Sequence, residues 1–225
     1  MRRKVVLLCL TFLVFFSQSV FAFSFISDNS QKIIEDTWNA QTMNQLEDGV
    51  VAVPQTAIDN YLQSVLAEYP EFKQVKLNIH ADNKIEADID TAASGKIKVE
   101  GTITAFKQNK DMSSMTVHID KKELLNRPVT SWLFSRMSIG MLMKLFGNPL
   151  SDNQYGVAVE AKDNNLIINF KPFIDKSSLK QVEIMGNSLV DAVNIDDITS
   201  AEGVLYLHTS INGGNMLINT IKNIL

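Results

Sequence analysis

The side chains best suited to acid–base or metal chemistry are three histidines, His80, His118 and His208. Each falls in a stretch where apolar and polar residues alternate, and each takes a polar position. Because alternate residues of a strand point to opposite faces, this spacing predicts that each histidine lies on the solvated face of its own strand. A metal site would need three separate strands to bring them together, and their spacing does not require that. We therefore predict no metal site.

Carboxylates gather in two groups that suit acid–base catalysis or calcium binding. The groups are Asp82, Glu86, Asp88 and Asp90, and then Asp191, Asp196 and Asp197. The second group lacks the Asp-x-Asp-x-Asp-Gly order of a calcium loop, and such runs are usually solvated strand faces or turns. Phosphate-binding, zinc-protease and nucleophile-elbow motifs are absent from the sequence. We predict no catalytic residues, no cofactor and no enzyme activity. A hydrolase stays a hypothesis that requires a histidine within hydrogen-bond reach of a serine or carboxylate in a cleft.

The first residues predict export. Basic residues at 2–4 precede an apolar run from Val5 to Phe16, and a small-residue cleavage pattern ends at Ala22. We predict a signal peptide over 1–22 and a periplasmic or secreted bacterial protein. An uncleaved anchor is the alternative, although the run is shorter than the ~20 residues of a membrane span. Cys9, the only cysteine, lies in this segment, so the mature chain would have no disulfide and no thiolate metal site.

The mature chain would be acidic. Removing the three basic residues of the leader from 21 leaves 18 against 25 acidic residues, a net charge of about −7. This balance argues against nucleic-acid binding and against docking on anionic lipid by charge alone. Any affinity for lipid would have to be apolar. We expect a lead-in over 23–48, with a short helix or an arm at 30–42, and a single domain over 49–225.

The spacing of apolar residues then predicts alternating helix and strand. A short strand is expected from Gly49 to Pro54, and an amphipathic helix with apolar residues from Ile58 to Tyr69. From residue 72 to 120 the period is two, which predicts antiparallel hairpins with one wet face and turns at 81–84 and 109–111. Gly101 interrupts the alternation and predicts a bulge or bend. Further strands are expected at 155–159, 166–170, 182–184, 189–193 and 204–208, and a last helix at 216–225.

The most apolar stretch of the domain runs from Ser131 to Phe146. Arg127-Pro128 precedes it and Gly147-Asn148-Pro149 follows it, which predicts one helix between a start and a stop signal. Its polar strip is narrow, so it must be covered almost all round. Its methionines, beside tryptophan and phenylalanine, would make an adaptable apolar surface. Protein core and an apolar ligand both remain open as what covers it.

The order of these elements resembles a family. A leader, an amphipathic helix beginning Thr56-Ala57-Ile58, and strands at 75–79 and 97–101 are similar to bacterial envelope proteins of tubular (TULIP-like) lipid-binding type. The resemblance is to single-unit members of unknown function and covers about residues 50–211 by pattern. It implies a long helix in a strongly curved antiparallel sheet, with acyl chains between them and no fixed catalytic residues. The apolar helix in mid-chain departs from that pattern.

We therefore predict an α+β fold in which a strongly curved antiparallel sheet of hairpins packs around one or two long helices. The predicted function is that of an exported, non-enzymatic protein that binds a lipid or another apolar ligand in a groove between sheet and helix. The predicted ligand contacts come from both helices: Leu62, Leu66, Trp132, Leu133, Met137, Met141 and Leu145. The alternative is an interaction module that docks through an apolar helix onto an envelope protein partner and takes no small ligand.

Overall fold

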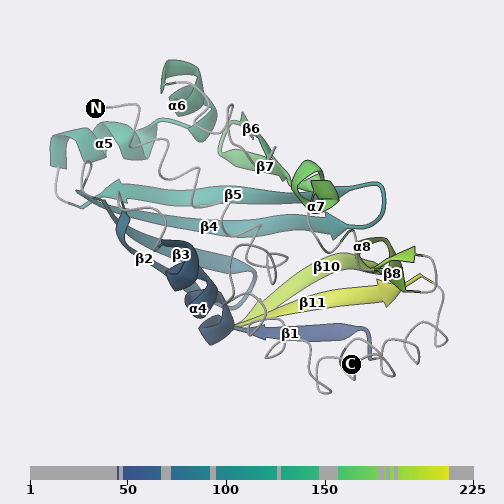
Figure 1. Ribbon diagram of the computed structural model, residues 1–225. Coiled ribbons are helices and arrows are strands. Elements are labelled where there is room, and N and C mark those ends of the chain that lie inside the picture. Colours follow the sequence, from purple (N-terminus) through teal and green to yellow (C-terminus); the bar gives the residue numbers. More distant parts are fainter. Residues whose placement is uncertain are drawn as a thin grey trace.

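Most of the residues that the structure describes belong to one open antiparallel sheet with short helices beside it (Figure 1). The computed structural model describes residues 45, 48–66, 72–91, 95–125, 128–146, 157–176, 180, 183–184 and 187–212. The leader at 1–22 and the helices expected at 30–42 and 216–225 lie outside these residues. The prediction that antiparallel hairpins dominate the domain is confirmed.

The sheet has nine strands in the order β1-β11-β10-β4-β5-β7-β6, and β2 joins through β3, which also pairs with β4. Its strands are β1 (Val50–Pro54), β2 (Phe72–Ile79), β3 (Lys84–Thr91), β4 (Gly95–Gln108), β5 (Ser113–Leu124), β6 (Ala158–Lys162), β7 (Asn165–Asn169), β10 (Val193–Ala201) and β11 (Val204–Ile211). A separate pair is formed by β8 (Glu183–Ile184) and β9 (Asn187–Ser188). The buried apolar side chains of the described residues form one cluster on one face of this sheet.

The tight turns use the residues that the sequence supplies for them. Asp82 and Asn83, between β2 and β3, have φ values of 60° and 59°. Asp and Asn tolerate this left-handed region because their short polar side chains bond locally, and two such residues suit a tight hairpin. In the β4–β5 turn, the Asn109 side-chain oxygen accepts hydrogen bonds from the backbone N–H groups of Asp111 and Met112, both at 2.9 Å. The turns predicted at these places are confirmed.

Gly101 lies at a bulge in the longest hairpin, as its break in the alternation predicts. The β4–β5 register shifts between Glu100 and Gly101. A Cβ atom on Gly101 would lie 2.8 Å from the backbone oxygen of His118 and 3.1 Å from a methyl carbon of Val117. Glycine is therefore required here because the neighbouring strand approaches too closely for a side chain.

The sheet forks along one edge of β4. Residues 95–102 of β4 pair with β3, whereas β10 pairs with β4 only at Gln108. The tip of the β2–β3 hairpin enters the fork. There the backbone N–H of Asn83 donates to Ser200 Oγ at 2.7 Å, and the N–H of Gly203 donates to the oxygen of Ile79 at 2.9 Å. These bonds tie the tips of the β2–β3 and β10–β11 hairpins together.

The helices are short. They are α4 (Gln55–Leu66), α5 (Pro128–Arg136), α6 (Ile139–Phe146), α7 (Lys171–Lys176) and α8 (Leu189–Ala192). The predicted amphipathic helix is confirmed as α4, which has 12 residues and contacts β1 and β2. No described helix is longer than α4. The expectation of long helices inside the sheet is therefore wrong for the part of the chain that the structure describes.

The expectation of one helix from Ser131 to Phe146 is wrong in the same way, because the chain breaks at Met137 and Ser138. Ser138 Oγ accepts the N–H of Met141 at 3.2 Å, which is the usual role of a helix N-cap. Two more N–H groups at the start of α6 donate hydrogen bonds to the β6–β7 turn. Ile139 donates to Asn164 Oδ1 at 3.3 Å and Gly140 to the oxygen of Asp163 at 2.7 Å. The partners that begin the second helix therefore include residues that are distant in sequence.

The region before the last hairpin also differs from the prediction. Residues 189–192 form the helical turn α8 instead of a strand, whereas Asp196 and Asp197 lie in β10 at exposed positions, in keeping with the solvated strand face or turn expected for them. The β10–β11 register shifts between Ile195 and Asp197, so the two aspartates are both exposed. This bulge hides the period of two that would have indicated a strand.

Candidate functional site

The α5–α6 pair lies along the β5–β7–β6 side of the sheet, away from β1 and β11 (Figure 1). α5 rests on β5, where the N–H of Leu124 donates to Ser131 Oγ at 2.9 Å and Phe134 is buried. Lys122 of β5 is buried beneath the helix, and its Nζ donates to the backbone oxygen of Ser135 at 3.4 Å. The first helix is therefore fixed by its inner face and by both its ends.

α6 sits directly on the β6–β7 turn. A Cβ atom on Gly140 would lie 3.1 Å from the backbone N of Asp163, so the helix backbone approaches the turn closely. Ile139 and Leu142 are buried in the common core. The small residue in an otherwise bulky helix is thus explained by the close contact of α6 with the turn.

The outer side of the pair carries large apolar side chains in contact with solvent. Trp132 is 59% exposed, Met141 52% and Leu145 62%. Met137 and Met143 are partly buried and pack against the core. The described apolar side chains of the pair are therefore divided into buried, half-buried and exposed sets, instead of being covered all round as the sequence predicts.

The seven residues predicted to contact a ligand do not lie on one surface. Leu62 is buried on α4, against the core at β1 and β2, and Leu66 belongs to the same helix. The other five belong to or directly follow α5 and α6, at β5, β6 and β7: Trp132, Leu133, Met137, Met141 and Leu145. The side chains of Leu66 and Leu133 are not among those that the structure describes. The structure thus brings Trp132, Met137, Met141 and Leu145 into one helix pair and separates Leu62 from them.

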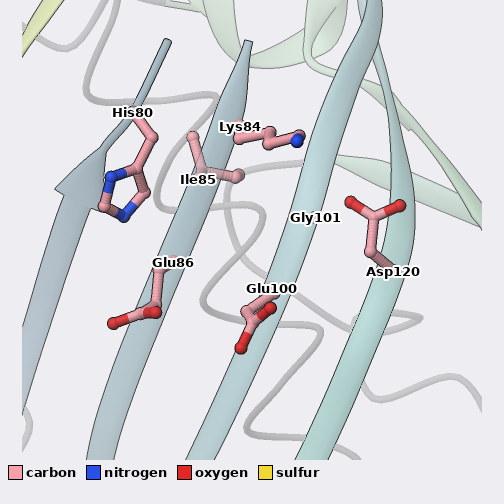
Figure 2. A pocket seen from close by; sticks show the side chains of 7 residues that line it. All are labelled: His80, Lys84, Ile85, Glu86, Glu100, Gly101 and Asp120. Atoms are coloured by element: carbon pink, nitrogen blue, oxygen red, sulfur yellow. The ribbon is translucent and has the colours of Figure 1, made fainter. Parts of the chain in front are cut away.

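Polar side chains form a second feature, a hollow of about 200 Å³ on the outer side of β3, β4 and β5. Figure 2 shows its lining residues on neighbouring strands: His80, Lys84, Ile85, Glu86, Glu100, Gly101 and Asp120. His80 Nδ1 lies 3.0 Å from a carboxylate oxygen of Glu202. The condition set by the hydrolase hypothesis, a histidine beside a carboxylate in a cleft, is therefore met in part.

The lining of the hollow is polar and mostly charged. Among the described residues that line it there is no serine, threonine or cysteine. Lys98 Nζ lies 2.7 Å from Glu86, and this hydrogen bond holds the pKa of Glu86 below its usual range, against a smaller opposite effect of burial. A general acid needs the opposite shift. Asp120 accepts a hydrogen bond from Thr102 Oγ1 at 2.7 Å. Cross-strand pairs of this kind account for the carboxylates as a solvated sheet face.

The remaining histidines lie on the polar face, as predicted, and apart from each other. His118 Nδ1 is 2.8 Å from Asn165 Oδ1, and His208 Nε2 is 2.9 Å from Thr199 Oγ1. Among the described residues, no group of three or more His, Cys, Asp or Glu side chains could hold a metal ion. None of the described helices is long and apolar enough to cross a membrane.

No protein-family model, curated protein or solved structure matches the chain.

Proposed function

We propose that the chain is an exported, non-enzymatic protein that binds a lipid or another apolar ligand at the α5–α6 pair. The observation that carries the proposal is the division of its apolar side chains. Trp132, Met141 and Leu145 face solvent beside Met137 and Met143, which are half-buried against the core. A ligand that covered the first set and reached the second would bury apolar surface that is otherwise wet.

The break at residues 137–138 gives the ligand a place to enter. Two short helices joined by two residues are easier to separate from the sheet than one continuous helix, because each is fixed by its own contacts. Methionine side chains adapt to variable shapes, which suits an acyl chain. Each methylene removed from water would contribute about 0.8 kcal/mol, so a chain of ordinary length supplies enough driving force without a fixed polar contact.

The pattern-level resemblance to tubular lipid-binding envelope proteins supports the same proposal, as does the leader predicted over 1–22. That leader would put the protein in the periplasm or outside the cell, where lipids can be carried or sensed. The proposed binding mode differs from that resemblance, because the ligand would lie against the outer side of two short helices at one side of an open sheet.

The test begins with protein expressed as the full chain with its leader and purified gently from the envelope. We expect mass spectrometry of an organic extract to show co-purified lipid, and a fluorescent fatty acid to bind and be displaced by unlabelled fatty acid. Met141→Asp should weaken probe binding about tenfold or more, because a carboxylate is costly to cover with an acyl chain. Met112→Asp is the matched control, since Met112 is also exposed but lies in the distant β4–β5 turn. Absence of both lipid and probe binding would sink the proposal.

A protein partner that docks onto the same side chains is the second candidate. It is favoured by their exposure, because more than half of the Trp132 and Leu145 side chains is accessible before any rearrangement of α5 or α6. The two candidates predict different behaviour of Met141→Asp. Loss of partner capture with unchanged lipid content indicates docking of a protein, whereas loss of lipid indicates a ligand site.

A further inference from the structure

The α5–α6 pair differs from the rest of the chain in charge. Between Glu123 and Asp152 there is no acidic residue, although the whole chain has 25. The basic residues in this interval are Arg127, Arg136 and Lys144. Arg136 and Lys144 lie in the last turns of α5 and α6 and are exposed. A protein with net negative charge thus has one helix pair that presents only positive charge.

Each helix combines that charge with large apolar side chains on its exposed face. On α5, the guanidinium carbon of Arg136 lies 4.6 Å from the centre of the Trp132 ring, four residues earlier. On α6, Met141, Lys144 and Leu145 are all exposed, and their spacing of three and four residues places them on one face. The sides of the two helices that are turned toward the sheet carry the buried Phe134, Ile139 and Leu142.

Of the acidic groups next to the pair, Glu123 on β5 lies 3.3 Å from Lys121 Nζ, and such a salt bridge leaves little net field beyond its immediate surroundings. Asp163 is exposed in the β6–β7 turn at the start of α6, whereas Lys144 lies in the last turn of that helix. The positive charges of Arg136 and Lys144 therefore remain effective at the outer surface of the two helices.

We propose that the exposed face of α5 and α6 docks on the surface of an anionic lipid bilayer. Interfacial helices bind in this way when they present tryptophan and leucine together with basic residues, because the apolar groups enter the headgroup boundary while the cations meet lipid phosphates. The acidic remainder of the protein would be repelled, so the bilayer would be met by this face first. The inference rests on the proposed function and names the membrane as the surface from which the ligand is taken or to which it is delivered.

The experiment uses the full chain with Trp38→Phe, which leaves Trp132 as its single tryptophan. Vesicles of phosphatidylcholine alone are compared with vesicles that also contain phosphatidylglycerol. We expect sedimentation with the anionic vesicles, a blue shift of Trp132 emission, and loss of both at high salt. The double variant Arg136→Glu/Lys144→Glu should lower binding to anionic vesicles by about tenfold or more. Lys107→Glu/Lys110→Glu, two exposed lysines near the β4–β5 turn, is the matched control and should change binding less than about threefold.

Binding of the fluorescent fatty acid, measured on the same preparation, separates the two proposals. Fatty-acid binding without sedimentation overturns membrane docking and leaves the ligand site standing. Sedimentation without fatty-acid binding supports docking and removes the ligand site. Equal binding to both vesicle types, or an unchanged affinity in the Arg136→Glu/Lys144→Glu variant, overturns docking through these charges. Failure of every vesicle, together with saturable capture of a protein through Trp132, identifies the face as a protein-docking surface and overturns the inference.

Discussion

α4 and the α5–α6 pair both cover the sheet, but they divide their apolar side chains differently. In α4 the apolar positions Ile58 and Leu62 are buried, and exposed positions such as Asn60 and Gln63 are polar. In α6 Leu142 is 2% exposed and Leu145 is 62% exposed, three residues apart in one helix. The first arrangement needs nothing besides the sheet to be stable in water. The second leaves apolar area that only another molecule would cover.

The α5–α6 pair also differs in its charges from the outer face of β3 and β4. The outer face of β3 and β4 carries opposed carboxylates, Glu86 and Glu100. Lys98 pairs with Glu86, and Lys121 pairs with both Glu100 and Glu123. The α5–α6 pair carries basic residues without acidic ones between Glu123 and Asp152. A balanced face keeps a protein soluble, and an unbalanced one favours a partner of opposite charge.

Leucine-to-alanine variants in the two regions test the difference most directly. Leu62→Ala in α4 should lower the free energy of unfolding by about 2–5 kcal/mol, because it leaves a cavity in the core. Leu142→Ala in α6 should cost a similar amount, whereas Leu145→Ala should change stability by about 0.5 kcal/mol or less. Urea denaturation followed by circular dichroism measures all three. An equal loss for Leu142→Ala and Leu145→Ala would show that Leu145 is covered by protein as well as Leu142.

The start of α4 offers a second test, because one residue there joins three elements through its side chain and its backbone. Gln55 Oε1 accepts the N–H of Ile79 at 3.1 Å, and the Gln55 N–H donates to the oxygen of Gly203 at 2.8 Å. Gln55→Ala should cost about 1–3 kcal/mol, since the buried N–H of Ile79 would lose its partner. Gln63→Ala, at an exposed position of the same helix, should change stability by about 0.5 kcal/mol or less. A neutral Gln55→Ala would mean that water replaces the lost bond.

Local chemistry made the strands and their turns predictable. The period of two from residue 72 to 120, and the Asp82-Asn83 turn, are properties of neighbouring residues, so they are visible in the sequence. Gly101 was informative for the same reason, since its lack of a side chain marked the bulge.

The break in the apolar helix was not predictable in this way. The groups that begin α6 include Asp163 and Asn164, which come from a turn that follows the helix in sequence. Ser138 was a local signal for a new helix start, but the apolar residues on both sides of it indicated one continuous helix. The exposure of Trp132 and Leu145 was equally hidden, because a helical wheel shows how wide an apolar face is and not which part of it the sheet covers.

Lowering the pH should remove the stabilisation that the charged pairs of the sheet face contribute, and it should not affect the α5–α6 pair. Lys98 holds the pKa of Glu86 below its ordinary value of 4.5, so the pair stabilises the fold above that pH and the effect is lost as the pH falls through the lowered pKa. Glu86→Gln should cost about 1 kcal/mol near pH 7 and almost nothing well below pH 4. Lys98→Met should behave alike, and the double variant should lose no more than either single variant. Additive losses would show that the two side chains do not interact.

The smallest effect is expected for the pair of Arg136 and Trp132. An exposed cation over an aromatic ring contributes about 0.5 kcal/mol, so Arg136→Gln should barely change the free energy of unfolding. It should change the emission of Trp132 in the Trp38→Phe chain, because the ring loses the charge above it. Lys144→Gln, which removes a charge from the other helix, should leave the emission unchanged. A loss above about 2 kcal/mol for Arg136→Gln would mean that the pair stabilises the fold and that its exposure needs no partner to explain it. A loss of about 0.5 kcal/mol would mean that the fold does not depend on this pair. The exposed tryptophan and the positive charge beside it would then be available to bind an anionic surface.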